Sequence, residues 1–312
     1  MTTFGGNQIA GSAGGEHAER FTHLRPLLFT IVYEILGSAT ESDDVLQDSY
    51  LRWAEVDLAT VRDTKSYLAQ LVTRQALNAL RAGARRREEY IGPWLPEPLL
   101  LDDRDASTDV VLAESVSMAM LVLLETLTPD ERAVFVLREV FGFDYDEIAG
   151  AVGNSAVNVR QVAHRAREHV QARRKRFEPA DSAKTAELTE QFMTAASTGD
   201  VDGLMALLAP DATWTADSNG KATAARRPVV GARKVAAILS ALFRVAAERM
   251  PDVRFETAVY NSSPSIVVYN GDQLEGVFLI EIVDGLISHF YAMRNPDKLL
   301  GIAVPREISR TV

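Results

Sequence analysis

The sequence contains no cysteine among its 312 residues. This absence excludes disulfide bonds, cysteine-ligated zinc sites and thiol catalysis. The sequence also has no run of about 18 apolar residues, which a membrane-spanning helix requires. The Gly-rich start, residues 1–17, lacks the apolar centre of a secretory signal. We therefore expect a cytoplasmic protein with no membrane partner, whose residues 1–17 are disordered.

Positive charge is scarce overall but locally concentrated. The 33 Lys and Arg residues are outnumbered by 43 Asp and Glu residues, which gives a formal net charge of −10. Contacts to phosphates supply sequence-independent affinity for nucleic acids, so this composition argues against indiscriminate binding. Between Ala156 and Arg176, however, Glu168 is the only acidic residue among many basic ones. Any contact with DNA is therefore expected to be confined to patches of the surface.

Residues 143–176 carry the pattern of a helix-turn-helix. A short helix from about Asp146 to Val152 is followed by Gly153-Asn154-Ser155, and the Ser155 hydroxyl can cap a second helix. At 100° per residue, the second helix has a small apolar inward arc and a polar outward arc. The inward residues are Val159, Val162, Ala163, Ala166 and Val170; the outward ones are Val157, Arg160, Gln161, His164 and Arg165. Such a helix can enter a DNA major groove, although an ordinary hairpin with a solvated basic face is the alternative.

Three helices are predicted before residue 90. The first runs from Ala18 to Leu36. The second, from Thr40 to about Glu55, is acidic, with Thr40 and Asp43 spaced as a capping box. Its outward arc combines acidic and amide side chains with one apolar residue: Asp44, Gln47, Asp48 and Leu51. This stripe suits a basic protein partner, although the helix dipole alone also favours acidic residues in a first turn.

The third helix, from Thr64 or Lys65 to about Arg87, becomes more basic toward its end. Cations at a helix C-terminus are also what the helix dipole favours, so a purely structural explanation stays open. A second basic helix elsewhere in the chain strengthens the functional interpretation. Two separated basic helices could hold two separated segments of DNA.

Residues 91–109 are rich in proline, which excludes a regular helix and favours an extended linker. Trp94 and Leu95 are apolar, so we expect this linker to dock on another part of the protein. Helix returns at Val110 to Leu124, with an inward side that comprises Val111, Val116, Met120, Leu121 and Leu124. Thr128 and Glu131 form a capping box around Pro129 and open a helix that reaches about Phe141.

From residue 185 onward the pattern changes to α+β. Helices are expected over 186–197, 199–208 and 233–249, and strands over 212–216, 253–260, 265–269, 274–283 and 286–293. Asn270-Gly271 and Asp284-Gly285 are hairpin turns between antiparallel strands. Asn295 can cap a last short helix that begins at Pro296. These elements predict a strongly curved antiparallel sheet with covering helices.

The order of acidic helix, basic helix, Pro-rich linker and the segment Leu127 to Val170 resembles bacterial RNA polymerase sigma factors of the extracytoplasmic-function (ECF) group. The resemblance covers residues 18–176. It implies a region 2-like domain over 18–90, a linker over 91–109 and a region 4-like helix-turn-helix domain over 110–178. Core RNA polymerase and promoter DNA would be the partners, with no cofactor and no metal.

The resemblance also implies roles for individual residues. Asp44, Gln47, Asp48 and Leu51 would bind core polymerase. The loop Val56 to Asp63 would capture a flipped base of the −10 element, together with Arg74, Asn78 and Arg81; such flipping is itself a source of selectivity. The −35 element would be read by Asn158, Arg160, Gln161, His164 and Arg165.

Residues 185–304 are similar to the SnoaL-like cone fold, carried by GDVDGLMALLAPDATW over residues 199–214. Some ECF sigma factors combine such a tail with three motifs, of which this chain has two intact, at 94–98 and 295–299, and one in an altered version at 217–221. The resemblance implies an interdomain contact that tunes sigma activity in place of a dedicated anti-sigma factor. The residues expected to form this contact are Trp94, Pro96, Asp217, Lys221, Asn295, Asp297 and Lys298. Asn295 to Leu299 could also be a simple helix cap.

A SnoaL-like cone can instead hold a small ligand or catalyse a reaction in a hydrophobic pocket. The candidate pocket residues are Trp214, Asp217, Tyr260, Tyr269, His289 and Tyr291, with His289 and Tyr291 on one side of a strand. A single histidine on a strand is more often a hydrogen-bonded structural residue than a base, so we do not expect an enzyme. The sequence therefore predicts two all-α domains followed by an α+β cone domain, acting as a sigma factor. A ligand-sensing regulator is the alternative, and a repressor that shares only the helix-turn-helix leaves the acidic helix unexplained.

Overall fold

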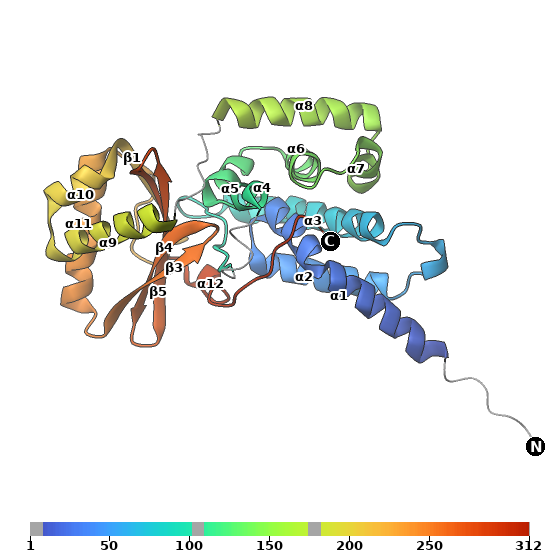
Figure 1. Ribbon diagram of the computed structural model, residues 1–312, viewed down its shortest axis with the longest axis horizontal. Helices are drawn as coiled ribbons and strands as arrows, with labels where there is room; N and C mark the ends of the chain where they lie inside the picture. Colours follow the sequence, from blue (N-terminus) through green and yellow to red (C-terminus); the bar gives the residue numbers. More distant parts are fainter. Residues whose placement is uncertain (1–8, 102–108, 174–181, 312) are drawn as a thin grey trace, which may run out of the picture. The chain divides into compact units, whose positions relative to one another are not determined.

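The computed structural model describes residues 9–101, 109–173 and 182–311, and divides into two compact units (Figure 1). The helical unit comprises the described residues up to Ala84, then Leu124–Arg173, and the residues from Glu307 onward. The sheet unit comprises Arg85–Leu123 and the described residues that lead to Arg306. This division differs from the predicted domain limits, because the linker and residues 110–123 group with the sheet.

Three helices open the helical unit: α1 (Ile9–Leu36), α2 (Ala39–Trp53) and α3 (Thr64–Glu88). Helix α1 begins at Ile9, inside the stretch 1–17 that the sequence predicts to be disordered, and residues 1–8 lie outside the described part. A buried anchor stabilises this end of the helix. The ring Nε2 of His17 lies 2.8 Å from the Val56 carbonyl oxygen, and the indole Nε1 of Trp53 donates to the His17 carbonyl oxygen at 2.9 Å.

The junction between α1 and α2 depends on Gly37 and Ser38. Gly37 adopts φ +68°, a left-handed conformation that ends α1 at low cost only for glycine. Ser38 is extended, and its hydroxyl accepts the Glu41 backbone N–H at 3.1 Å. The predicted cap at Thr40 is therefore wrong, because the second helix restarts directly after Gly37.

Helices α4 (Val110–Ser115), α5 (Met118–Leu124), α6 (Pro129–Phe135), α7 (Tyr145–Val152) and α8 (Ala156–Arg173) follow, with a π-helical turn at Val136–Val140. The predicted helix from Val110 to Leu124 is broken between α4 and α5. The break changes the helical phase, so Val111 is 43% exposed whereas Leu112 is buried. The capping box of Thr128 and Glu131 and the Ser155 cap of α8 are both confirmed.

The sheet unit contains α9 (Ser182–Thr198), α10 (Val201–Leu207), α11 (Ala232–Arg249) and α12 (Pro296–Leu299). Its strands are β1 (Leu208–Asp217), β2 (Val229–Val230), β3 (Val253–Tyr260), β4 (Ser263–Asn270), β5 (Gln273–Val283) and β6 (Leu286–Met293). The strand order is β2-β1-β6-β5-β4-β3. The β1–β6 pair is parallel, contrary to the predicted antiparallel sheet. A long connection through α11 and three hairpins allows this pairing, whereas the hairpins themselves are antiparallel.

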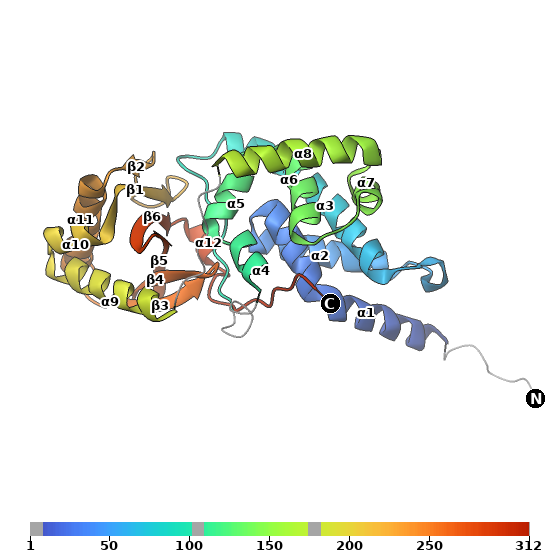
Figure 2. The same ribbon diagram turned by 45° about the horizontal axis from the view of Figure 1, so that its top comes forward.

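Both faces of the sheet are covered, and alternate strand residues serve opposite faces. One face packs against α9, α10 and α11 and includes Trp214 and Phe290 (Figure 2). The other face includes Tyr291 and Met293, and it is covered by Leu95 of the linker and Met118 of α5. Within the described residues, no helix is long and apolar enough to cross a membrane.

Candidate functional site

The acidic helix α2 presents the predicted stripe to solvent. Asp44, Gln47 and Asp48 are exposed, and Leu51 is 59% exposed. The opposite arc is fixed by burial, since Trp53 at the end of the helix is fully buried. An exposed leucine between carboxylates can contact a protein surface that offers both apolar and basic groups.

Helix α8 also presents its predicted face. Arg160, Gln161, His164 and Arg165 are exposed, and Val157 is 64% exposed. The predicted inward residues of α8 are all buried: Val159, Val162, Ala163, Ala166 and Val170. Two outward side chains are oriented by weak ion pairs: His164 Nδ1 lies 3.2 Å from Glu168 Oε2, and Arg165 Nε lies 3.7 Å from Glu131 Oε1. Asn158 is half-buried, and its backbone N–H donates to the Ser155 hydroxyl at 3.2 Å.

Helix α3 differs, because Arg74 and Arg81 contact other helices of the same unit. Arg74 donates from Nε and Nη2 to the carbonyl oxygen of Gly150 in α7, at 3.2 and 2.6 Å. Arg81 Nη2 lies 2.6 Å from Asp130 Oδ1 of α6. Asn78 is exposed, whereas Asp63 Oδ1 accepts the Ser66 backbone N–H at 2.7 Å and so caps α3.

The contact between α3 and α7 extends beyond the arginines. Ser66 donates its hydroxyl to the Glu147 carboxylate. At Gly150, an added Cβ would lie 3.1 Å from Gln70 Oε1, so the absence of a side chain allows close approach. Ser66, Gln70 and Arg74 are spaced four residues apart and form one stripe of α3. Sequence reasoning missed this contact because nothing local to α3 identifies its partner.

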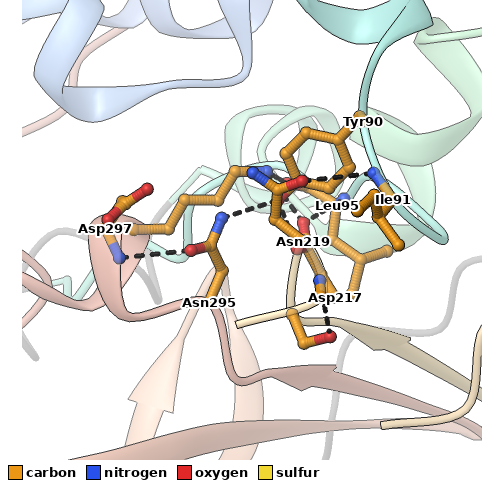
Figure 3. Close-up of polar contacts among 10 residues, drawn as sticks. Tyr90, Ile91, Leu95, Asp217, Asn219, Asn295 and Asp297 are labelled. Atoms are coloured by element: carbon orange, nitrogen blue, oxygen red, sulfur yellow. Dashed lines mark hydrogen bonds and ion pairs between the residues drawn. The ribbon is translucent and has the colours of Figure 1, made fainter. Parts of the chain in front are cut away.

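In the sheet unit, Asp217 is the centre of the linker contact. Its side chain is 0% exposed. Oδ2 accepts the Leu95 backbone N–H at 2.8 Å and pairs with Lys298 Nζ at 2.8 Å, while Oδ1 accepts the Tyr90 hydroxyl (Figure 3). A buried carboxylate with three donors is fully compensated, so it fixes the linker in one position.

Lys298 completes this arrangement from α12. Its Nζ donates to the Leu95 carbonyl oxygen at 2.6 Å and lies 3.9 Å from the centroid of the Trp94 ring. Burial lowers the pKa of Lys298, and the Asp217 carboxylate opposes that shift. Burial and the neighbouring Asp217 raise the pKa of the Tyr90 hydroxyl well above its ordinary value. The ammonium therefore lies between a carboxylate and an aromatic face, a favourable site for a cation.

The remaining predicted contact residues surround this centre. Asn295 Nδ2 donates to the Tyr90 hydroxyl at 2.7 Å, while its Oδ1 caps α12 through the Asp297 N–H at 3.2 Å (Figure 3). Asn295 therefore both caps α12 and contacts Tyr90. Lys221 pairs with Asp297, and Pro96 is buried. Tyr90 was missed because it precedes the linker in a segment without a recognisable motif.

The candidate pocket residues do not converge. Trp214 lies on the α11 side of the sheet, whereas Tyr260 and Tyr291 lie on the linker side. His289 and Tyr291 do share one side, with ring centroids 4.0 Å apart, and His289 Nε2 lies 2.9 Å from the Thr215 hydroxyl. Burial raises the pKa of Tyr260 to about 12. The candidate pocket residues therefore lie on two faces of the sheet.

Three known families match segments of the chain. Sigma-70 region 2 matches residues 20–86, Sigma-70 region 4 matches residues 117–170, and the SnoaL-like domain matches residues 189–290. The ECF RNA polymerase sigma factor SigJ of Mycobacterium tuberculosis strain H37Rv is 34% identical over 290 residues, 90% of this chain and 92% of that protein. The chain belongs to the ECF RNA polymerase sigma factor family.

Further comparisons support this ECF sigma factor assignment. The crystal structure of M. tuberculosis SigJ matches with a TM-score of 0.72 at 31% sequence identity, covering 92% of this chain and 99% of that one. The M. tuberculosis sigma factor SigI is 27% identical and covers 88% of this chain and 92% of its own length. The predicted combination of two helical sigma domains and a SnoaL-like domain is confirmed.

One residue outside every predicted motif joins region 4 to the SnoaL-like domain. Asn261, in the turn between β3 and β4, accepts the Leu99 N–H at its Oδ1 and donates from Nδ2 to the Val116 carbonyl oxygen, both at 2.8 Å. The region 4 match begins at residue 117, directly after Val116. Asn261 has φ +50° and Ser262 has φ +58°, and Asn is favoured at such positions. That turn preference was the only local signal for this residue.

Proposed function

We propose that this chain is a promoter-specificity subunit that binds core RNA polymerase and directs initiation at promoters with −35 and −10 elements. The observation that carries the proposal is the pair of exposed predicted faces, on α2 and α8, in a chain of this family. A cytoplasmic location follows from this role.

The polymerase contact is assigned to α2. Asp44, Gln47, Asp48 and Leu51 all point to solvent, and the exposed side chains of this helix also include Thr40 and Arg52. Their carboxylates would pair with basic groups of the polymerase at the rim, and Leu51 would supply apolar contact.

The −35 element is assigned to α8. Gln161 and Arg165 can form paired hydrogen bonds with base edges in a major groove, whereas Asn158, Arg160 and His164 can contact bases or phosphates. Gly153, with φ +70°, sets the turn that allows α8 to project.

The −10 element is assigned to α3 and the loop before it. Asp63, Arg74, Asn78 and Arg81 are the proposed contacts. Since Arg74 and Arg81 are held by α7 and α6, these bonds must be exchanged for DNA contacts when a promoter is opened. Both bonds are exposed, so their exchange costs little.

The SnoaL-like domain is proposed to tune this activity by holding the linker, in place of a dedicated anti-sigma factor. The buried contacts of Asp217 and Lys298 with Leu95 support this proposal. A regulatory role is favoured over a catalytic one, because the candidate pocket residues lie on two faces. Affinity purification of the full chain from its host tests whether an anti-sigma partner exists.

Transcription with purified core polymerase tests the proposed function. The full chain should produce run-off transcripts from a promoter selected with it. Asp48→Arg should abolish polymerase binding, because it places a cation where the polymerase is expected to offer cations, while −35 DNA binding is retained. Asp272→Arg, at the exposed β4–β5 turn, is the matched control. It should bind polymerase and −35 DNA as the unsubstituted protein does. Loss of both activities in Asp48→Arg would indicate misfolding, and absence of any transcript from the full chain would refute the proposal.

A further inference from the structure

The break between α4 and α5 leaves backbone groups that need partners. Val116 is the C-cap of α4, and its N–H donates back to Leu112 and Glu114. Its carbonyl oxygen accepts the side-chain amide of Asn261 at 2.8 Å. A buried carbonyl without such a partner would be costly, so the Asn261 amide stabilises the break itself.

The same side chain also holds the linker. Asn261 Oδ1 accepts the Leu99 N–H at 2.8 Å, and the Asn261 backbone N–H donates to the Leu99 carbonyl oxygen at 2.9 Å. Leu100 then forms an isolated antiparallel bridge with Tyr260. Asn261 thus uses its backbone and both ends of its amide, and it is fully buried.

Apolar side chains also connect the start of α5 to the sheet and the linker. Met118, the first residue of α5, is buried in one cluster with Leu95, Tyr260 and Tyr291. Ala119 and Val122 pack against that cluster. The start of region 4 therefore rests on the SnoaL-like sheet, next to the residue that caps the break.

We propose that Asn261 is a positioning residue through which the SnoaL-like domain sets the position of the first region 4 helix, and so tunes the use of the −35 element. The inference rests on the proposed function. Asp217 and Lys298 connect the SnoaL-like domain to the linker, whereas Asn261 also connects it to region 4. Asn261 does not touch DNA; it acts through α5.

The chain offers a matched pair for the test. Asn219 also has positive φ, at +48°, and its Oδ1 accepts the Ile91 backbone N–H at 3.1 Å. It holds the linker but makes no described hydrogen bond to α4 or α5. N261G and N219G both keep the left-handed backbone accessible and both remove a side-chain amide. N261D keeps the acceptor for Leu99 and removes the donor to Val116.

Amide hydrogen exchange and transcription are measured on the full chain. In N261G, peptides covering residues 95–101 and 110–124 should exchange roughly five- to tenfold faster, the factor implied by loss of one or two hydrogen bonds. In N261D, the acceleration should be confined to 110–124. In N219G, residues 110–124 should exchange as in the original chain.

The second readout is the ratio of transcription from a promoter with an intact −35 element to that from one with the element replaced. N261G should change this ratio about two- to tenfold, the range expected for coupling between connected sites. N219G loosens the linker alone, so it should leave this ratio unchanged even if total transcription from both promoters changes. Unchanged exchange at 110–124 in N261G would overturn the inference, and so would faster exchange with an unchanged ratio, because the residue would then be merely structural.

Two further outcomes are distinguishable. If N261G does not fold, amide exchange and the transcription ratio are measured on N261D instead, and these two results decide the inference. If the original chain produces no transcript, the proposed function fails, while the exchange data still decide whether Asn261 holds α4 and α5.

Discussion

The two basic helices of this sigma factor are in different states. On α8, Arg160, Gln161, His164 and Arg165 are exposed; Arg160 lies 5.2 Å from the centroid of the Tyr145 ring, and His164 and Arg165 lie near carboxylates. On α3, Arg74 and Arg81 are bonded to Gly150 and Asp130. A helix with a free polar face can meet DNA directly, whereas a helix with engaged arginines must first release them. The same sequence pattern, a basic amphipathic helix, therefore occurs both with exposed polar side chains and with arginines bonded to neighbouring helices.

The contacts between region 2 and region 4 also differ from one another in how deeply they are buried. Arg132 of α6 is buried, and its Nε donates to the Glu34 carbonyl oxygen of α1 at 2.8 Å while its Nη1 contacts the Glu125 carboxylate. Arg74 and Arg81 are exposed. Buried and exposed ion pairs differ strongly in the cost of removal. Removing the contacts of Arg132, the buried anchor, should therefore cost far more than removing those of Arg74 and Arg81.

The largest expected effect comes from removing the anchor. Arg132→Ala should lower the free energy of unfolding by about 3–5 kcal/mol, because it leaves buried polar partners unpaired. Urea denaturation of the full chain, followed by circular dichroism, measures the change. Arg25→Ala removes the exposed pair with Asp43 and should cost about 0–1 kcal/mol. If both variants lost the same free energy of unfolding, the distinction between a buried anchor and an exposed contact would not hold.

An intermediate effect is expected on α8. Gln161→Ala should lose about 1–3 kcal/mol of discrimination at one base position of the −35 element, because the side chain would read a base edge. Binding to a set of singly substituted −35 duplexes measures this loss. Arg167, on the same helix, is bonded to Glu139 at 2.6 Å, so Arg167→Ala should not change the base preference. A uniform loss of affinity in Gln161→Ala would contradict base reading by that residue.

The smallest expected effect sharpens the account of α3. Asp130→Asn removes the charge that holds Arg81, so the chain bound to core polymerase should bind a single-stranded −10 oligonucleotide about two- to fivefold more tightly. Fluorescence anisotropy measures the affinity. Asp146→Asn removes an exposed carboxylate of α7 and serves as the control. An unchanged affinity in Asp130→Asn would show that the pair does not compete with DNA.

Much of the fold followed from local patterns. The inward arc of α8, the capping box at Thr128 and the hairpin turns at Asn270 and Asp284 were all predicted correctly, because each depends on residues close in the chain. The contact residues Asp217 and Lys298 were found through motifs. Their geometry, a buried ion pair against the Leu95 backbone, was not predictable from spacing.

Three of the misses share one cause, which is that the partner lies far away in sequence. The parallel β1–β6 pair, the α3–α7 contact and the break near Val116 each depend on residues more than 70 positions apart. Helical periodicity favoured a continuous helix over 110–124, and a side chain from the β3–β4 turn stabilises the break instead. The two-sided placement of the candidate pocket residues has a local cause: alternate strand residues face opposite sides, which separates Trp214 from His289 and Tyr291.

The proposed exchange of the Arg74 and Arg81 bonds for DNA contacts implies that α3 moves away from α7 before a promoter opens, and this is the central claim. Since the chain has no cysteine, Q70C combined with G150C introduces a single pair of thiols at the close approach between these helices. Run-off transcription by the oxidised and the reduced double variant, with each single variant as control, measures the requirement directly. The account predicts no transcript from the oxidised protein and recovery on reduction. Equal transcription by a fully cross-linked protein and its reduced form would contradict it.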